Sequence, residues 1–358
     1  MSAIADLLAA LPIPIIQAPM LGASSPDMAV AVSDAGAMGT LAATAHRPDA
    51  LEAEIAAMKV RTAGPFGVNL LVARQVTASG EVLAAARARL APWYAELGLP
   101  EPDVPNDFTG HIPEQVAAIA RARPAAASFA FDVPTPAEVA QLKAAGVPII
   151  GTATTVAEAR AWASLGADAV CAQGFEAGGH RGHFLAETEA SLVGTMALVP
   201  AVRAAVDLPV IAAGGIMDGA GVAAALALGA AAVQMGTAFL LADEALVSAP
   251  WRHAIETAAD DPTRLTSAIT GRHARGIETR FMRELRPFEG EMPPYPVQNR
   301  LTQPLRVAAA KAANTDVLSL WAGQGVRLAR HGPAGDLVRQ FWAEAQDTAK
   351  ALAARVGG

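Results

Sequence analysis

Eight short apolar segments, each followed by a helical pattern, constrain the fold of this chain more than any other feature. Short strands that are apolar along their length and separated by helices are typical of a parallel sheet covered by those helices. A doubly wound sheet more often stops at about five to seven strands, whereas eight strand–helix units close a barrel. The sequence therefore predicts an α/β fold of the (β/α)8 TIM-barrel class. The strand segments are residues 14–20, 38–44, 65–71, 128–132, 148–153, 167–173, 209–215 and 231–237.

Local signals mark where several helices begin and end. Ser25, Thr135 and Asp218 each stand directly before a helical pattern, and a side-chain oxygen there can cap the first turn. A glutamate three residues after Thr135 completes a capping box, while Gly36 and Gly146 are suited to ending their helices. The chain is predicted to close with helices at 317–330 and 335–354.

Two segments, residues 72–111 and 245–314, do not fit the repeat. Both are far longer than the usual connection of about two to six residues. Because both leave from the carboxyl ends of predicted strands, we expect them to lie over the barrel mouth as a mainly helical cap. Extra packing or a homodimer contact is the alternative use, and it is compatible with a cap. The predicted barrel comprises 1–72, 112–244 and 315–358, and the cap comprises 73–111 and 245–314.

The composition argues against several classes of partner. The chain is 53% hydrophobic and 17% charged, and its net charge of −7 gives no reason to expect nucleic acid or an anionic membrane. No apolar run is long enough to span a membrane, and the first residues do not resemble a secretory signal. The single cysteine, Cys171, fits a reducing cytoplasm. Since Cys171 lies inside the sixth strand segment, we expect it to pack as a small apolar side chain rather than to act as a loop nucleophile.

The ends of the seventh and eighth strand segments carry the donors that an anionic phosphate needs. TIM barrels bind phosphate with the loops after these two strands. Here the ends read Ala-Gly-Gly-Ile at 213–216 and Gln-Met-Gly-Thr at 234–237. Backbone N–H groups of glycines and a threonine hydroxyl can surround a phosphate. The alternative is that each glycine only makes a tight turn, but two sets at the two expected strands favour phosphate.

Three amides, Gln17, Asn69 and Gln173, stand where a barrel wall is expected to be apolar. Buried amides cost free energy unless they are paired, and a carboxamide can pair with the polar edge of a bound ring. A phosphate site together with amides indicates a nucleotide-like cofactor with a flat polar ring, and flavin mononucleotide (FMN) fits this description. The alternative is that the amides only satisfy neighbouring loops.

The sixth strand segment leads into a glycine-rich loop that carries His180. A histidine there can serve as a base or hydrogen-bond donor poised near neutral pH, so His180 is the candidate catalytic residue. We interpret His183, three residues further on, as structural. The sequence contains no metal-ligand cluster, P-loop or dinucleotide-binding glycine motif, so no metal site is expected.

An ordered set of motifs spanning nearly the whole chain resembles the nitronate monooxygenase family, formerly 2-nitropropane dioxygenases, and within it the bacterial class I group. No single motif is specific for this family, but the whole set of motifs in this order is a strong indication of it. The motifs are Gln-Ala-Pro-Met at 17–20, Gly-Val-Asn at 67–69, Gln-Gly-Phe-Glu-Ala-Gly-Gly-His-Arg-Gly at 173–182, the two strand ends at 213–216 and 234–237, and Trp-Ala-Gly-Gln-Gly at 321–325.

The resemblance implies an FMN-bearing barrel that oxidises alkyl nitronates with O2 to a carbonyl compound and nitrite. It implies that His180 is catalytic. Tyr295 and the arginines of the second long segment are candidates to bind an anionic substrate such as propionate 3-nitronate. By position, the residues implied to hold FMN are Met20, Asn69, Gln173, Gly178, Gly215, Gln234, Met235, Gly236 and Thr237.

Two other functions remain open from the sequence. Relatives that share the fold and the Gly-His loop include an FMN-dependent enoyl-acyl-carrier reductase and an NADH:quinone reductase, and both use NAD(P)H. The motifs at 17–20, 178–182 and 321–325 favour the monooxygenase. A flavin-binding protein without catalysis is the other alternative. The loop histidine argues against it, because a purely binding site has little use for a group that titrates near neutrality.

Overall fold

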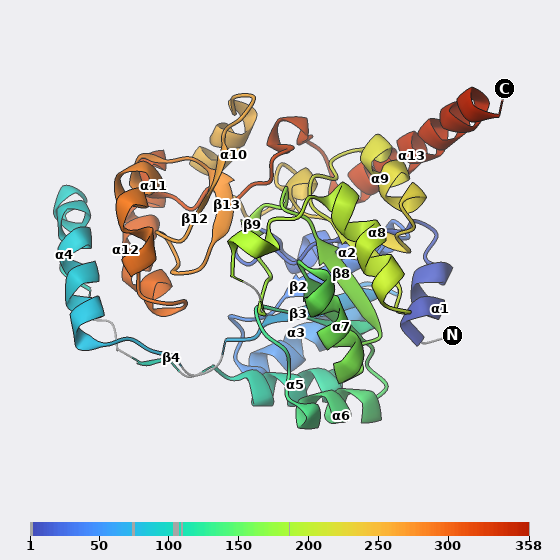
Figure 1. Ribbon diagram of the computed structural model, residues 1–358, viewed down its shortest axis with the longest axis horizontal. Coiled ribbons are helices and arrows are strands. Elements are labelled where there is room, and N and C mark those ends of the chain that lie inside the picture. Colours follow the sequence, from blue (N-terminus) through green and yellow to red (C-terminus); the bar gives the residue numbers. More distant parts are fainter. Residues whose placement is uncertain (1–2, 74–75, 103–106, 109, 186, 358) are drawn as a thin grey trace.

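Eight parallel strands form a closed barrel in the computed structural model, which describes residues 3–73, 76–102, 107–108, 110–185 and 187–357 (Figure 1). Their order around the sheet is β1-β11-β10-β8-β7-β6-β3-β2, and a parallel bridge between Ile16 and Met38 joins β1 to β2. All eight predicted strand segments are confirmed. The strands are β1 (Ile15–Gln17), β2 (Gly39–Ala42), β3 (Phe66–Leu71), β6 (Ala126–Ala130), β7 (Ile149–Ala153), β8 (Ala169–Gln173), β10 (Val210–Ala213) and β11 (Ala232–Met235).

Helices on the outside of the barrel follow the predicted capping signals. Ser25 accepts a hydrogen bond from the Met28 N–H, Thr135 makes a complete capping box, and Asp218 accepts from the Gly221 N–H. One helix, α8, was not predicted, because no side-chain cap marks its start and it contains a proline. The outer helices are α2 (Pro26–Asp34), α3 (Pro48–Arg61), α5 (Ile112–Ala122), α6 (Pro136–Ala144), α7 (Val156–Leu165), α8 (Thr195–Ala205), α9 (Gly219–Ala227) and α13 (Ala334–Val356).

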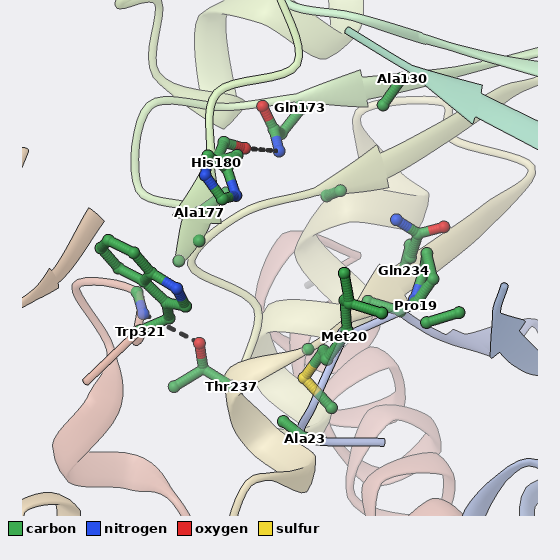
Figure 2. Close-up of a pocket in the computed structure, with 18 of the residues that line it drawn as sticks. Pro19, Met20, Ala23, Ala130, Gln173, Ala177, His180, Gln234, Thr237 and Trp321 are labelled. Atoms are coloured by element: carbon green, nitrogen blue, oxygen red, sulfur yellow. Dashed lines mark hydrogen bonds between the residues drawn. The ribbon is translucent and has the colours of Figure 1, made fainter. Parts of the chain in front are cut away.

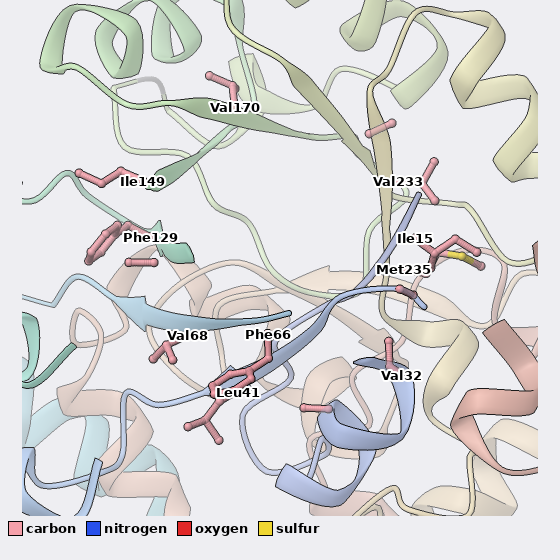
Figure 3. Packing of buried hydrophobic residues seen from close by; sticks show 14 of the residues in the cluster. Ile15, Val32, Leu41, Phe66, Val68, Phe129, Ile149, Val170, Val233 and Met235 are labelled. Carbon is pink, nitrogen blue, oxygen red and sulfur yellow. The ribbon is translucent and has the colours of Figure 1, made fainter. Parts of the chain in front are cut away.

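The pleat of the strands divides the core into an outer and an inner layer. Alternate residues of each strand point outward and pack against the helices, as Figure 3 shows for Val68, Phe129 and Val233. The residues between them point into the barrel, where small side chains pack with α1 (Ala3–Ala10). Met235 belongs to the outer layer, whereas its neighbour Gln234 faces the barrel interior. The inner layer thus fills the barrel below its carboxyl end and leaves that end for a site.

The second long segment adds an antiparallel sheet beside the barrel mouth. The strand order is β12 (Thr263–Thr266), β13 (Ala274–Ile277) and β9 (Gly179–His180), with His180 opposite Ala274. Helices α10 (Ala249–Glu256), α11 (Arg280–Leu285) and α12 (Val297–Lys311) accompany it. Because β9 belongs to the loop after β8, this sheet ties the His180 loop directly to the second long segment.

The first long segment packs against the second. Helix α4 (Gly80–Glu96) lies beside α12 in Figure 1, and the Tyr94 hydroxyl donates to the Leu301 carbonyl at 2.5 Å. Helix α4 contains Pro92 and continues through it to Glu96. A short strand pair, β4 (Val76–Thr77) with β5 (Asp107–Phe108), flanks it. A buried cluster drawn from both segments, including Trp93, Phe281 and Leu301, joins them.

The predicted helix at 317–330 is wrong. Only two short 3₁₀ turns form there, η4 (Thr315–Val317) and η5 (Val326–Leu328), and the chain between them is irregular apart from a bridge at Trp321. Tertiary hydrogen bonds override the local helical pattern: the Ile277 N–H donates to the Leu320 carbonyl at 2.8 Å, and the Gln324 N–H donates to the Glu176 carbonyl at 2.9 Å. The predicted closing helix at 335–354 is confirmed as α13. In the described part of the chain, no helix is both long enough and apolar enough to cross a membrane.

Candidate active site

A cavity opens at the carboxyl ends of the barrel strands, where (β/α)8 enzymes place their active sites. Its floor consists of inward-facing residues, and its walls come from the loops after β8, β10 and β11, from the second long segment and from residues 321–325. The cavity floor includes Asn69, Ser128, Ile150, Thr152, Cys171, Gln173, Ala213 and Gln234. Burial raises the pKa of the Cys171 thiol to about 12, as expected for a packed thiol rather than a nucleophile.

The structure brings together all but one of the predicted site residues. Met20, Gln173, His180, Gln234 and Thr237 face one another around the cavity in Figure 2. Asn69, Gly178, Gly215 and Gly236 also line it. Met235 does not, because its side chain points outward into the helix-facing core. Its assignment as a side-chain ligand does not follow from this geometry, and the sequence missed it because two neighbours on a strand face opposite ways.

The ends of β10 and β11 present unused hydrogen-bond donors to the cavity. Among the described residues, no acceptor bonds the backbone N–H groups of Gly214, Gly215, Gly236 or Thr237. The Thr237 hydroxyl accepts from the Gly323 N–H at 2.9 Å, which leaves its own proton for a further partner. The first turn of α8 offers no comparable site, since its Thr195 N–H is already bonded by the Glu176 carboxylate. These donors fit a phosphate, whose oxygens are acceptors only.

The amides of the site divide into two groups. The Asn69 amide donates to the Ser128 hydroxyl at 3.0 Å, and its carbonyl oxygen accepts from no described residue. The Gln234 side chain makes no hydrogen bond within the part of the chain that the structure describes. These two amides are available to a ligand ring. Gln17, by contrast, is fully buried, lies outside the cavity lining and accepts from the Thr40 N–H at 2.9 Å, so its role is to satisfy the strand ends.

Gln173 and Arg181 brace the loop that carries His180. The Gln173 amide donates to the His180 carbonyl at 3.1 Å and accepts from the Gly182 N–H at 2.8 Å (Figure 2). The Arg181 guanidinium is completely buried and donates to the carbonyls of Gly174, Gln173 and Ser191. Gly178 allows the same loop to pass close to residues 322–323, since a Cβ there would lie 2.4 Å from the Gly323 nitrogen.

His180 lies among three aromatic rings. The ring centroids of Phe131, Tyr295 and Trp321 are 5.2, 5.7 and 5.6 Å from the imidazole centroid. Burial, with the nearby positive charges of Arg272 and Arg306, lowers the pKa of His180 to about 3. The expectation that this histidine titrates near neutrality is therefore wrong: the imidazole is uncharged at neutral pH, because a charged ring would lose its hydration and gain no carboxylate partner.

Two cationic side chains border the histidine. Arg272 lies 4.3 Å from the Phe131 ring centroid and donates to the Arg181 and His183 carbonyls. Arg306 lines the cavity and donates to the Asn299 carbonyl and side-chain oxygens at 3.0 and 2.6 Å. Burial lowers the pKa of Arg306 to about 10, so it remains charged at neutral pH. No described carboxylate pairs with it.

Several residues at the site carry no strong sequence signal. Phe131 follows β6 with a φ of 81°, a backbone strain that is common at functional sites in non-glycine residues. Thr270 bonds the His180 ring, but it lies in a segment without any regular pattern. Asn299 and Arg306 are exposed to the cavity from α12. His183, expected to be structural, bonds Thr188 and lies outside the cavity lining.

With this geometry established, comparison with known proteins decides the family. The family profile described as nitronate monooxygenase matches residues 3–344. The chain belongs to the nitronate monooxygenase family. A probable nitronate monooxygenase of Staphylococcus aureus (strain Newman) is 41% identical over 326 residues, which is 91% of this chain and 92% of that protein.

Two solved structures are similar over nearly the whole length of this nitronate monooxygenase family member. The structure of a nitroalkane oxidase from Streptomyces ansochromogenes has a TM-score of 0.91 and 41% sequence identity, covering 98% of this chain and 100% of that chain. The structure of FabK from Thermotoga maritima has a TM-score of 0.76 and 29% identity, covering 99% of each chain. Family and full-length relatives together make this protein an enzyme of the nitronate monooxygenase class.

The buried histidines predict a loss of stability in mild acid. Burial lowers the pKa of His180 to about 3, that of His183 to about 4, and that of His273 below 6.5. In the unfolded chain these groups take up protons near pH 6.5, whereas in the folded protein they stay neutral. The unfolded state therefore binds more protons as the pH falls, and the free energy of unfolding decreases as the pH falls from about 6.5 toward the folded-state pKa values of about 3 and 4. Urea unfolding at each pH measures this decrease.

Replacement of one of these histidines provides the control. The His183→Asn variant lies outside the cavity and is expected to lose stability less steeply over the same pH range, since it has one fewer group to protonate on unfolding. An unchanged slope in that variant, or an NMR titration of His180 near pH 6.5 in the wild-type protein, would contradict the assignment.

Proposed function

We propose that this protein is an FMN-dependent nitronate monooxygenase that oxidises alkyl nitronates with O2 to a carbonyl compound and nitrite. The observation that carries the proposal is the arrangement of the cavity. Unused donors at the ends of β10 and β11 lie on one side, and a neutral histidine in an aromatic surround lies on the other. Membership of the nitronate monooxygenase family supports a flavin and a nitronate substrate.

The residues present fit FMN. The N–H groups of Gly215, Gly236 and Thr237, with the Thr237 hydroxyl, would hold the phosphate. The unused groups of Asn69 and Gln234 would pair with the polar edge of the ring system. When bound, FMN would supply the chemistry of accepting electrons from the nitronate and passing them to O2. Met20 and Gly178 complete the lining, whereas Gln173 contributes chiefly by holding the His180 loop.

His180 would act as a proton acceptor. Its Nε2 bonds Thr270 at 2.9 Å, so Nδ1 is the ring nitrogen left for a substrate. With a neutral nitroalkane, the C–H bond next to the nitro group would break, the proton would move to Nδ1, and the bonding pair would be delocalised onto the nitro oxygens to give the nitronate. The negative charge of the nitronate would then pair with the imidazolium, which burial otherwise disfavours. A nitronate supplied as such needs no base. We therefore propose that the site serves both forms of substrate and that His180 matters most for the neutral one.

Arg306 and Tyr295 would select substrates with a second anionic group. Arg306 is a buried cation in the cavity wall without a described carboxylate partner, and a buried charge is costly unless it is paired. Guanidinium groups bind carboxylates with two parallel hydrogen bonds. The carboxylate of propionate 3-nitronate would supply the missing anion. Among the cap arginines, Arg280 and Arg286 instead form exposed ion pairs with Glu96 and Glu278, and are not candidates.

We also propose the cap as a functional unit. Residues 245–314 supply Thr270, Tyr295, Asn299 and Arg306 to the cavity, while no described residue of 73–111 lines it. The first segment would thus support the second through the contact of α4 with α12 rather than touch the ligand. The boundaries at 1–72, 112–244 and 315–358 for the barrel, a homodimer and a cytoplasmic location stay predictions.

The two alternatives differ from this proposal in what reduces the flavin. A reductase that accepts NAD(P)H would need room for a nicotinamide over the ring system, and Trp321 and Tyr295 lie around His180 at that face. The similarity to FabK is lower than that to the nitroalkane oxidase in both identity and TM-score. In a flavin-binding protein without catalysis, neither a nitronate nor NAD(P)H would reduce the flavin.

Anaerobic mixing tests the proposed function. The purified protein is expected to contain FMN, to lose its flavin absorbance on mixing with propionate 3-nitronate, and to keep it on mixing with NADH. Absorbance spectra under argon measure both responses. A colourless protein that FMN cannot reconstitute would overturn the cofactor assignment. Rapid bleaching by NADH with no response to nitronate would instead favour the reductases.

Replacing the histidine separates catalysis from cofactor binding. His180→Asn is expected to retain FMN and to lose turnover of a neutral nitroalkane by about 10²–10⁴-fold, the usual contribution of a general base. Turnover of the preformed nitronate is expected to fall much less. Steady-state O2 consumption with each substrate and the FMN-to-protein ratio measure this. Full activity on both substrates would show that His180 has no chemical role.

Replacing the unpaired arginine tests substrate selection. Arg306→Leu is expected to raise the KM for propionate 3-nitronate by about 10–100-fold, the cost of a lost charged hydrogen-bond pair. The KM for an uncharged alkyl nitronate is expected to change little. Arg300→Leu, an exposed position on the same helix, makes the same change of charge and is the matched control. Equal effects of both variants would mean that only the net charge matters.

A further inference from the structure

We infer that Thr270 is a positioning residue that fixes both the orientation and the tautomer of His180, so that the proton sits on Nε2 and the lone pair on Nδ1. This inference rests on the proposed function, because it concerns the base of that reaction. It goes beyond that proposal in naming a residue outside the barrel, in the second long segment, as the one that prepares the base.

The hydrogen bonds of Thr270 determine which group donates. Its hydroxyl oxygen lies 2.9 Å from His180 Nε2 and 3.0 Å from the Arg272 carbonyl oxygen. A carbonyl can only accept, and a threonine hydroxyl has a single proton. Both contacts are therefore satisfied together only when the hydroxyl donates to the Arg272 carbonyl and accepts from a protonated Nε2.

The consequence lies on the other side of the ring. A neutral imidazole carries one N–H, so a proton on Nε2 leaves Nδ1 unprotonated and able to accept a substrate proton. With the opposite tautomer, Nδ1 would be a donor and the ring would have no basic atom for the substrate. Whether Nδ1 of His180 acts as a base or as a hydrogen-bond donor thus depends on the direction in which the Thr270 hydroxyl donates its proton.

The surroundings of His180 offer its Nε2 no substitute for Thr270. The rings of Phe131, Tyr295 and Trp321 surround the imidazole and provide no strong acceptor at their faces. No other described residue has a side-chain hydrogen bond to the His180 ring. Among the described residues a single hydrogen bond therefore orients the ring, while the Gln173 side chain bonds only the backbone of His180.

Thr270 itself is held firmly by α12. The carbonyls of Ala268 and Ile269, just before it, accept from the side chains of Gln298 and Thr302 at 2.7 and 2.6 Å. Gly271, just after it, has a φ of 80°, and a Cβ at that position would lie 2.1 Å from the Pro293 carbonyl oxygen. The backbone on both sides is thus fixed to the cap, which makes the Thr270 hydroxyl a rigid partner.

Removing the hydroxyl while keeping the shape tests the inference. Thr270→Val is expected to lower kcat/KM for nitroethane by about 10–100-fold, the scale on which misplacement of a reacting group acts. It is expected to lower turnover of preformed ethyl nitronate by a much smaller factor. Thr270→Ser restores the hydroxyl and is expected to recover most of the loss. O2 consumption by the FMN-loaded enzyme measures these rates.

A matched control removes a different buried threonine hydroxyl of the second long segment. Thr279→Val deletes the side-chain acceptor of the Met282 N–H at the start of α11 and leaves both hydrogen bonds of Thr270 in place. It is expected to lower the melting temperature without changing the ratio of the two substrate rates. A variant that only destabilises the cap would lower the rates with nitroethane and with ethyl nitronate by the same factor. Thr270→Val is instead expected to lower the nitroethane rate much more than the nitronate rate.

A second measurement reads the tautomer directly. In protein labelled with 15N-histidine, the His180 signals are assigned by their loss in His180→Asn. We expect them to report a proton on Nε2 in the wild type and a mixture of tautomers in Thr270→Val. A wild-type proton on Nδ1 would overturn the inference, as would equal losses on both substrates in Thr270→Val that serine does not rescue.

Failure of the proposed function would look different. If the wild-type enzyme oxidised neither compound, the monooxygenase proposal would fall, and the 15N spectrum would still decide where the proton sits. If it oxidised ethyl nitronate but not nitroethane, the nitronate chemistry would stand and the role of Thr270 in preparing a base would be overturned.

Discussion

The site depends on the buried guanidinium of Arg181, which forms an ion pair with no carboxylate of the described residues. Arg181 is completely buried, and its guanidinium donates hydrogen bonds to three backbone carbonyls at and beyond the end of β8. The carbonyl dipoles replace the water that the charge has lost, and in return the cation fixes the path of the loop. The Gln173 amide also bonds the His180 carbonyl and the Gly182 N–H, so it helps to fix the backbone of the loop at His180.

The barrel supplies a frame, and the second long segment supplies most of what makes the site selective. Inward-facing residues of the strands and the glycine ends of β10 and β11 form a floor that many barrel enzymes could share. The Tyr295 ring, the Thr270 hydroxyl that bonds His180 and the Arg306 cation come from the second long segment. If the proposed function holds, cofactor binding and substrate choice are carried by different parts of the sequence.

The elements of the barrel could be predicted from the sequence because each depends on local information. A short apolar run, a capping serine or a capping box needs only a few neighbouring residues. The failures share a non-local cause. Residues 317–330 have a helical pattern, but hydrogen bonds with β13 and with the loop after β8 prevent this segment from forming a helix. Met235 lies next to true cavity residues yet faces the helices. The burial that keeps His180 uncharged, and the approach of Thr270 and Arg306, arise only when distant segments meet.

Residues 318–325 contribute one wall of the cavity from near the end of the chain, which has a consequence for the biosynthesis of the protein. Those residues close a cavity whose opposite wall contains Met20, so the two walls are separated by about three hundred positions of chain. A ribosome has synthesised nearly the whole polypeptide before the cavity can exist. A nascent chain that already has its barrel strands still lacks the wall formed by Trp321 and Gly323. A ligand can therefore find the complete cavity only at the end of synthesis, and a chain cut before Trp321 would leave one side of the cavity open.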